Sequence, residues 1–193
     1  MKKKVGSEII FWLNVLEIAG IMLLLTLALA FQFLFGELPC PLCLLQRVGF
    51  LMVALGLLLN IRYGIYASHY AFTLLAALFT SLVALRQITL HIAPGDPGFG
   101  SKILGLHMYS WSFILCMLIV AYTATILGFH SQYKAPQPKG NALVTGQHPM
   151  IFYIVFTLLL ILIGVNFISV LLTCGLSACP DIPLSGMGGQ TLK

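Results

Sequence analysis

Charged side chains are scarce in this chain. Only 8% of its 193 residues are charged, against about 25% in soluble domains, and 60% are hydrophobic. This composition excludes an ordinary soluble domain and indicates an integral membrane protein. The chain also lacks a phosphate-binding glycine loop, a nucleophile elbow and a zinc-protease helix, so the enzyme classes built on those motifs are excluded.

The few charges that are present sum to +5. Basic residues can indicate nucleic-acid binding, but here they are thinly spread, and the cluster Lys2-Lys3-Lys4 directly precedes an apolar run. That arrangement is typical of a membrane-topology signal. The run extends from about Ile9 to Phe35, which is longer than a signal-peptide core, and no small-residue cleavage site interrupts it. We therefore expect a retained membrane span.

Five apolar runs reach, or come close to, the roughly 20 residues that a helix needs to cross a bilayer. Segments rich in glycine, proline or polar residues separate them. The sequence thus predicts an all-α integral membrane fold with five transmembrane helices, at about Ile9–Phe35, Leu44–Ile61, Tyr70–Leu90, Leu106–Phe129 and Ile151–Thr173.

The positions of lysine and arginine predict the orientation, because cytoplasmic loops carry an excess of both. A cytoplasmic N-terminus puts more of these residues inside, and after an odd number of spans the C-terminus lies outside. Four of the five cysteines then face the oxidising side. The inner set is Lys2, Lys3, Lys4, Arg62, Lys134 and Lys139, and the outer set is Lys102 and Lys193, with Arg47 and Arg86 at predicted helix ends.

The motif Cys40-x-x-Cys43 carries the clearest chemical signal. Two cysteines at this spacing can close a disulfide or open to a dithiol, and so can carry two electrons. No helix breaker follows Cys43 until Gly49, so we expect Cys43 in the first turn of a helix, whose positive end favours a thiolate. Arg47 follows on the same helix face, where its guanidinium can support a thiolate or donate hydrogen bonds to a ligand carbonyl.

Two plainer interpretations of this motif stay open. A lone C-x-x-C is often half of a zinc site, although zinc would need two further ligands. The two cysteines could also be chemically inert. The membrane context favours the redox interpretation.

A second cysteine pair, Cys174 and Cys179, follows the fifth apolar run, and the small residues between the two cysteines allow so short a loop to close. On the oxidising side such a pair is either redox-active or a structural staple. Cys116 lies among apolar residues of the fourth run, so we expect it to be a small buried hydrophobe. Glu17, in the first run, is expected to make a buried polar contact within the bundle.

Further candidate residues lie near the outer ends of the third and fourth runs. Ionisable residues at membrane depth are functional candidates. Arg86 is either a ligand contact or a snorkelling anchor. His91 either contacts a ligand or carries protons, or is an ordinary polar residue of the interface. Met108, Tyr109 and Trp111 fit an interfacial belt, or the wall of a hydrophobic pocket beside the C-x-x-C motif that contacts a flat ring.

These segments resemble the DsbB-type family of bacterial disulfide-bond oxidases, which are inner-membrane protein-dithiol:quinone oxidoreductases. The resemblance rests on Cys40-x-x-Cys43 followed by Arg47 at the start of the second span, and more loosely on residues 86–91 and 105–111. It implies a four-helix bundle that holds a quinone, either ubiquinone or menaquinone, near the motif. Cys43 would then face the quinone, Arg47 would contact it with Arg86 as a further candidate, and Cys40 would exchange with an incoming disulfide.

The chain departs from this family in one loop. Members usually carry a second cysteine pair between the third and fourth spans, which receives electrons from a DsbA-type periplasmic thioredoxin-like oxidant. Residues 91–105 contain no cysteine, so we expect the Cys174/Cys179 pair to substitute. The resulting organisation is a four-helix DsbB-like bundle over residues 1–130, a cytoplasmic linker loop over 131–150, a fifth span over 151–173 and a periplasmic tail over 174–193.

Two other function classes stay open. In a thiol-based metal-ion transporter, Cys40 and Cys43 would capture a soft cation and pass it to Cys116, although the spans offer few other soft donors. In a non-catalytic membrane scaffold the disulfides would be structural, which leaves Arg47 and Arg86 without a shared purpose.

Overall fold

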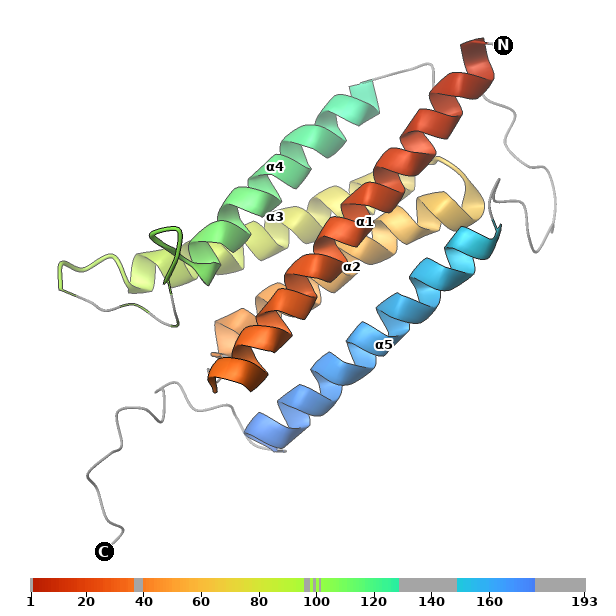
Figure 1. Cartoon of the computed structure of the whole chain (residues 1–193). Helices are drawn as coiled ribbons and strands as arrows, with labels where there is room; N and C mark the ends of the chain where they lie inside the picture. The colour runs from red at the N-terminus through yellow and green to blue at the C-terminus, as the bar shows by residue number, and fades with distance from the viewer. Residues whose placement is uncertain are drawn as a thin grey trace, which may run out of the picture.

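The chain folds into a bundle of long helices (Figure 1). The computed structural model describes residues 2–36, 40–95, 98, 100, 102–128 and 149–175. Its helices are α1 (Lys2–Phe35), α2 (Pro41–Tyr63), α3 (Ala67–Leu90), α4 (Met108–Gly128) and α5 (Pro149–Cys174), and a small hairpin is formed by β1 (Lys102–Ile103) and β2 (Leu106–His107).

All five of these helices are long and apolar enough to cross a membrane. The predicted all-α, five-helix membrane fold is therefore confirmed, and the chain is a multi-pass membrane protein. One predicted boundary was wrong: Leu106 and His107 belong to β2 and not to the fourth span. The reason is a tight turn, because Leu104 and Gly105 both have positive φ, which closes an antiparallel hairpin that pairs Ile103 with Leu106.

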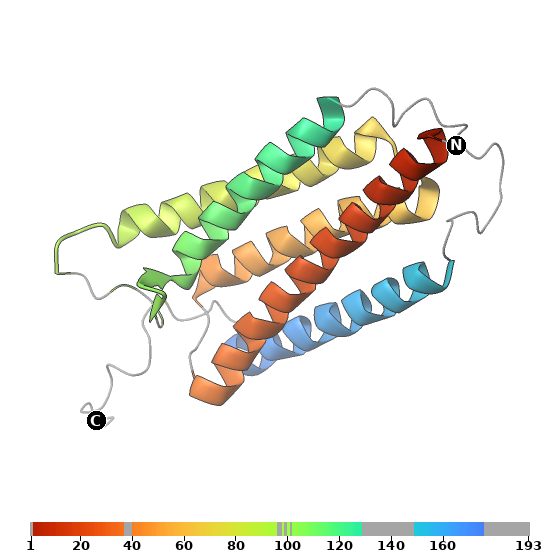
Figure 2. The same cartoon turned by 45° about the horizontal axis from the view of Figure 1, so that its top comes forward.

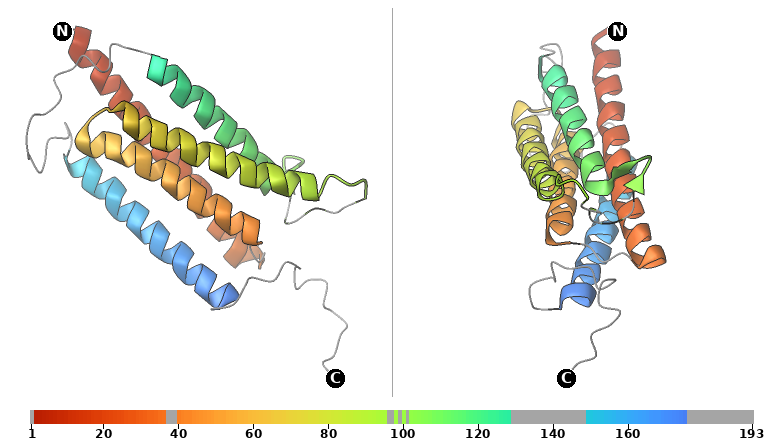
Figure 3. Two further views of the ribbon diagram at one scale, coloured as in Figure 1. Left: turned by 180° about the vertical axis from the view of Figure 1, so that it is seen from behind. Right: turned by 90° about the vertical axis from the view of Figure 1, so that its left-hand side faces the viewer.

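Helix α2 lies inside the bundle and contacts α1, α3 and α5, while α4 packs on α3. Helices α4 and α5 lie at opposite edges of the molecule, as Figures 1 and 2 both show. The views from behind and from the side show α1 crossing over α2, with α5 running beside both (Figure 3). Helix α5 is thus an addition to one flank of the α1–α4 bundle.

The cysteine-bearing helix ends lie at one end of the bundle. The end of α1, the start of α2, the end of α3, the start of α4 and the end of α5 are all found there (Figures 1 and 2). Cys40, Cys43 and Cys174 therefore lie at the same end, as the predicted alternation of spans requires. Cys179 lies outside the described residues, and the side of the membrane that this end faces stays a prediction.

Two glycines let α2 approach α3 closely. A Cβ atom built on Gly49 would collide with the Thr80 side chain, and one built on Gly56 would collide with the Thr73 hydroxyl. Small residues at such crossings are common in membrane bundles, where association depends on close packing. The contact at Gly49 lies about two turns from the start of α2, so it also fixes how the cysteine end of α2 meets the end of α3.

Two buried residues test expectations about the core. Cys116 is fully buried in α4 and carries no disulfide, as predicted for a small hydrophobe. The expected polar contact of Glu17 was wrong: neither carboxylate oxygen has a hydrogen-bond partner among the residues that the structure describes. One turn earlier on α1, the Asn14 amide and the Tyr70 hydroxyl do form a buried polar contact, at 3.3 Å.

Candidate redox site

The Cys40–Cys43 pair forms a disulfide at the start of α2, with the two Cα atoms 5.0 Å apart. Cys40 is the N-cap residue, and its sulfur accepts a hydrogen bond from the Cys43 amide at 3.1 Å. Pro41 occupies the first helical position, where its fixed φ suits a helix and its missing N–H is not needed. Cys43 therefore lies in the first turn of α2, as the sequence predicted.

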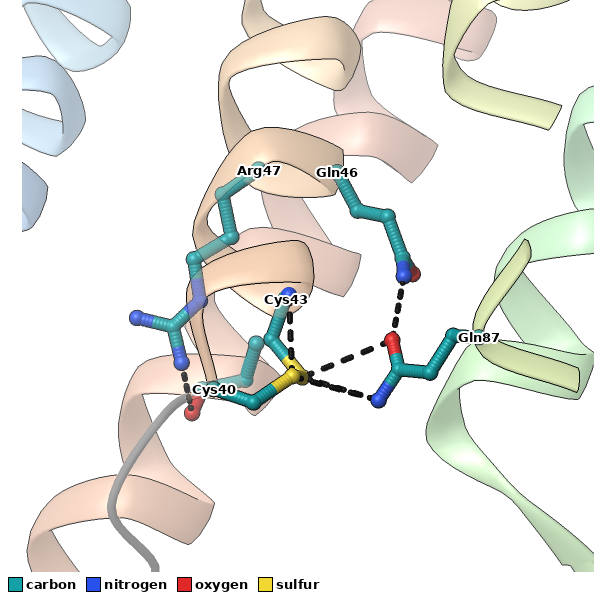
Figure 4. Close-up of a disulfide and its surroundings, with 6 residues drawn as sticks. Cys40, Cys43, Gln46, Arg47 and Gln87 are labelled. Atoms are coloured by element: carbon teal, nitrogen blue, oxygen red, sulfur yellow. Dashed lines mark hydrogen bonds between the residues drawn. A yellow bond between two sulfur atoms is a disulfide. The ribbon is translucent and has the colours of Figure 1, made fainter. Parts of the chain in front are cut away.

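Gln87, near the end of α3, holds this disulfide from the other side (Figure 4). Its side-chain nitrogen donates to the sulfurs of Cys40 at 3.2 Å and Cys43 at 3.4 Å. Its oxygen accepts a 2.7 Å hydrogen bond from the Gln46 amide, which turns the nitrogen toward the sulfurs. Because Gln87 is only 1% exposed, water does not compete for these donors. Such donors would bind a thiolate more strongly than a disulfide, since hydrogen bonds to ionised groups are stronger.

Arg47 lies one turn beyond Cys43 and is held by α1. Its guanidinium donates to the Gln32 side-chain oxygen at 2.8 Å and to the Ala28 carbonyl at 3.1 Å. The Gln32 nitrogen in turn donates to the Ser169 hydroxyl on α5 at 2.7 Å. A chain of hydrogen bonds thus connects Arg47 on α2, through α1, to the added helix α5.

A cavity of about 100 Å³ adjoins both Cys43 and Arg47. An apolar cavity of about 150 Å³ holds a benzene ring, so this space is on the scale of a single aromatic ring. Its walls come from α1, α2, α4 and the segment before α4. The lining residues are Leu24, Leu25, Ala28, Phe31, Gln32, Cys43, Gln46, Arg47, Phe50, Gly100, Met108, Tyr109, Trp111 and Ser112.

Met108, Tyr109 and Trp111, which the sequence singled out together, all line this cavity. Trp111 is fixed by a 2.9 Å hydrogen bond from its indole nitrogen to the Ile103 carbonyl of the hairpin. His91 is not among the lining residues, but its ring stacks on Tyr109 with the centroids 5.8 Å apart. The hairpin and the end of α3 therefore support the aromatic wall.

Arg86 is placed differently. Its side chain is exposed and is not among the residues that line the cavity, so the structure does not bring it together with Arg47. The residue that α3 directs toward the disulfide is the next one along the chain, Gln87.

The second cysteine pair is described in part. Cys174 is the last residue of α5, is 8% exposed and is disulfide-bonded. Cys179 lies outside the described residues. No group of three or more potential metal ligands occurs within the described part of the chain.

Sequence reasoning placed Gln87 with Arg86 and His91 at the end of the third span, but it assigned no role to the amide residues of this site. Gln32, Gln46 and Gln87 are all buried, although each lies within or beside a predicted apolar span. Their positions were a usable signal, because a polar residue at membrane depth needs a partner. Their partners were not readable: Gln32 and Ser169 are 137 residues apart in sequence.

Part of the chain matches a known protein family. Residues 11–101 match the family model described as Disulfide bond formation protein DsbB. No curated protein and no solved structure matches the chain. The matched segment contains the disulfide, Arg47 and Gln87, and ends before α4 and α5. Over residues 11–101 the chain is therefore similar to the DsbB family of disulfide bond formation proteins.

Proposed function

We propose that this protein is an inner-membrane oxidase that takes electrons from a periplasmic, thioredoxin-like DsbA-type dithiol and passes them through Cys40 and Cys43 to a membrane quinone. One observation carries the proposal: Cys43 of the disulfide and Arg47 line the same cavity. The family match supports disulfide formation as the overall reaction.

The residues of the cavity fit a quinone, whether ubiquinone or menaquinone. Arg47 supplies N–H donors for a ring oxygen, and Met108, Tyr109 and Trp111 supply a flat apolar wall. A bound quinone supplies an acceptor for two electrons and two protons. The enclosing aromatic wall limits water at Cys43, and the hydrogen bonds to Gln32 and Ala28 keep the guanidinium beside the cavity.

Electrons enter the Cys40–Cys43 pair by thiol–disulfide exchange. A thiolate attacks one sulfur of the disulfide, forms a mixed disulfide and releases the other sulfur as a thiolate; a second thiolate then completes the transfer. Two electrons and the balancing protons are gained by Cys40 and Cys43, and the donor pair becomes a disulfide. Gln87 favours this step because its amide donates to both sulfurs as they gain charge. Passing two electrons and two protons onward re-forms the Cys40–Cys43 disulfide.

The Cys174/Cys179 pair is proposed as the disulfide that meets the soluble partner. Cys174 is 8% exposed, so an incoming thiolate would attack Cys179 and release Cys174 as the thiolate. Val170, one turn before Cys174, lines the same α2–α5 cavity as Pro41 at the start of α2. Cys174 and the Cys40–Cys43 pair also lie at the same end of the bundle, which supports transfer from the tail pair to the first pair. We place the C-terminus in the periplasm and the N-terminus in the cytoplasm, because the distribution of lysine and arginine predicts this orientation.

The decisive experiment measures quinone reduction by the purified protein, given a reduced DsbA-like partner. Wild type, Cys43→Ser and Cys179→Ser are compared. Loss of activity in both variants supports a relay through two cysteine pairs. Loss of activity only in Cys43→Ser would support a quinone-linked oxidase in which the Cys174/Cys179 disulfide is structural. No activity in wild type would contradict the proposed function.

A further inference from the structure

Gln46 links the cavity beside Cys43 to the amide that holds the disulfide. It lies on α2 directly before Arg47, is 4% exposed, and lines this cavity together with Arg47 and Cys43. Its side-chain nitrogen donates to the Gln87 oxygen at 2.7 Å (Figure 4). One end of the Gln46 amide is therefore fixed on α3, and the other end is its oxygen.

The orientation of the Gln46 amide follows from its partner. Gln87 turns its nitrogen to the disulfide sulfurs, so it presents an oxygen to Gln46. The reverse orientation of Gln46 would bring two acceptor oxygens together, with no hydrogen between them. The hydrogen-bond network thus assigns the nitrogen of Gln46 to Gln87 and leaves the oxygen as an acceptor for another group.

The Gln46 oxygen is open to a ligand. None of the described residues donates a hydrogen bond to it, and it is not one of the fully enclosed side-chain atoms that lack a partner. It therefore keeps accessible surface. Because Gln46 is otherwise buried and lines the cavity beside Cys43, that surface is offered to a ligand in this cavity.

Arg47, the next residue, has the opposite hydrogen-bonding character. A guanidinium donates through five N–H groups and cannot accept. Arg47 gives N–H groups to Gln32 and Ala28, and the remaining ones are available at the cavity that it lines. Helix α2 therefore presents a donor and an acceptor from adjacent residues to the same space.

This combination distinguishes the two redox forms of a quinone. An oxidised quinone oxygen only accepts, so it can bind Arg47 but leaves the Gln46 oxygen facing another acceptor. A hydroquinone hydroxyl both accepts and donates, so a single hydroxyl can accept from Arg47 and donate to Gln46. In a buried site an acceptor left without a donor costs free energy, which favours the reduced form.

We propose that Gln46 is a specificity-determining residue of this cavity, whose oxygen accepts the hydroxyl of a membrane hydroquinone and so strengthens binding of the reduced ring relative to the oxidised ring. This inference rests on the proposed function, because it takes the product of that reaction as its ligand. In that reaction Cys40 and Cys43 give up two electrons and two protons and re-form their disulfide. Both protons stay on the hydroquinone, and Gln46 only accepts a hydrogen bond from one of its hydroxyls.

Site-resolved photolabelling tests the proposal. The full-length protein, with the Cys40–Cys43 disulfide intact, is placed in phosphatidylcholine nanodiscs under argon with no dithiol present. A short-tailed benzoquinone that carries a diazirine on its tail and the matching hydroquinone are titrated in separate samples. Mass spectrometry quantifies labelling of residues 108–112, which lie on the wall of the cavity. The readout is the Kd of the quinone divided by the Kd of the hydroquinone.

Two variants at Gln46 should move this ratio in opposite directions. Gln46→Leu removes one hydrogen bond to the hydroquinone only, so the ratio should fall about fivefold. Gln46→Glu places a carboxylate there, which accepts more strongly, so the ratio should rise. It also tests the proposal if Gln46→Leu fails to fold. Thr125→Leu, at an exposed position of α4 outside the cavity, is the control and should leave both constants as in wild type.

A ratio that neither Gln46 variant changes would overturn the proposal. Equal weakening of both ligands in Gln46→Leu would also overturn it, because a purely structural role of Gln46 predicts that result. The same holds if neither ligand labels residues 108–112. Since no dithiol is present, failure of dithiol-driven quinone reduction would contradict the proposed function, while the ratio of binding constants decides the role of Gln46.

Discussion

The side-chain nitrogen of Gln87 lies 3.2 Å from the sulfur of Cys40, and the amide is held in that orientation by Gln46. This contact places a buried donor from α3 against the redox pair on α2. It makes the amide a positioning group whose effect should be measurable as a change in reduction potential.

Replacing Gln87 with leucine removes both N–H donors from the disulfide sulfurs. Because these donors favour the charged, reduced pair, the reduction potential should fall by about 20–40 mV, which corresponds to about 1–2 kcal/mol for two electrons. Equilibration with glutathione buffers followed by alkylation and mass spectrometry of Cys40 and Cys43 measures the shift. Thr89→Ala is the control, since the Thr89 hydroxyl bonds only the Arg86 carbonyl among the contacts found. An unchanged potential in Gln87→Leu would show that the amide is structural.

Replacing Arg47 with lysine keeps the positive charge but removes the planar fork that reaches Gln32 and Ala28 together. We expect the KM for quinone to rise about tenfold, as for the loss of a hydrogen bond to a charged group, while the KM for the dithiol partner changes little. Steady-state kinetics with each substrate varied in turn measures the two constants. Equal effects on both would indicate a general loss of structure.

The Ser169 hydroxyl supports Arg47 indirectly, through Gln32. Ser169→Ala leaves the buried Gln32 nitrogen without this acceptor, so the KM for quinone should rise about two- to fivefold, a smaller effect than that of Arg47→Lys. In a double-mutant cycle with Gln32→Leu, the double variant should be no worse than Gln32→Leu alone, because both changes break one chain of hydrogen bonds. Additive effects would mean that α5 acts on the site by another route.

Gly49→Ala should destabilise the bundle, because the new methyl group collides with Thr80 where α2 meets α3. Overpacking of this kind costs about 1–3 kcal/mol of unfolding free energy. Reversible unfolding in mixed detergent measures the change. Gly20→Ala, which adds a methyl group to α1 with no atom within 4 Å, is the matched control and should not destabilise. Thr80→Ala should restore part of the stability lost in Gly49→Ala.

Cys116→Ala separates the oxidase from the metal-transport alternative. The thiol is fully buried, is not in a disulfide and does not line the cavity beside Cys43. Quinone reduction should therefore stay within about twofold of wild type, with a stability loss of about 1 kcal/mol for the removed sulfur. Loss of activity with retained folding would instead assign Cys116 a role in transfer across the membrane.

The helices and the position of the Cys40-x-x-Cys43 motif at a helix start could be predicted from the sequence, because both depend on local patterns of residues. The lengths of the apolar runs predicted the spans, and the absence of a helix breaker between Cys43 and Gly49 predicted that Cys43 lies in the first turn of α2. Met108, Tyr109 and Trp111 line the cavity beside Cys43, which corresponds to one of the two interpretations that the sequence left open for them. Cys116 is buried and carries no disulfide, as expected.

The rest of the site depends on which helix faces meet. Gln87 and Arg86 are adjacent polar residues, and the rotation of α3 against α2 decides that Gln87 reaches the sulfurs while Arg86 is exposed. That rotation follows from small residues such as Gly49 packing on Thr80. The hydrogen bond from Gln32 to Ser169 likewise requires α5 to lie beside α1, which a family based on four helices does not imply.

The sulfur of Cys40 is both half of the disulfide and the N-cap of α2. When the pair is reduced, a Cys40 thiolate would accept a stronger hydrogen bond from the Cys43 amide than a disulfide sulfur does. Reduction of the pair therefore stabilises the first turn of α2. The free energy of initiating α2 and the reduction potential of the Cys40–Cys43 pair are therefore linked. A substitution such as Pro41→Gly changes neither cysteine, but it should change the reduction potential of the Cys40–Cys43 pair because it alters the first turn of α2.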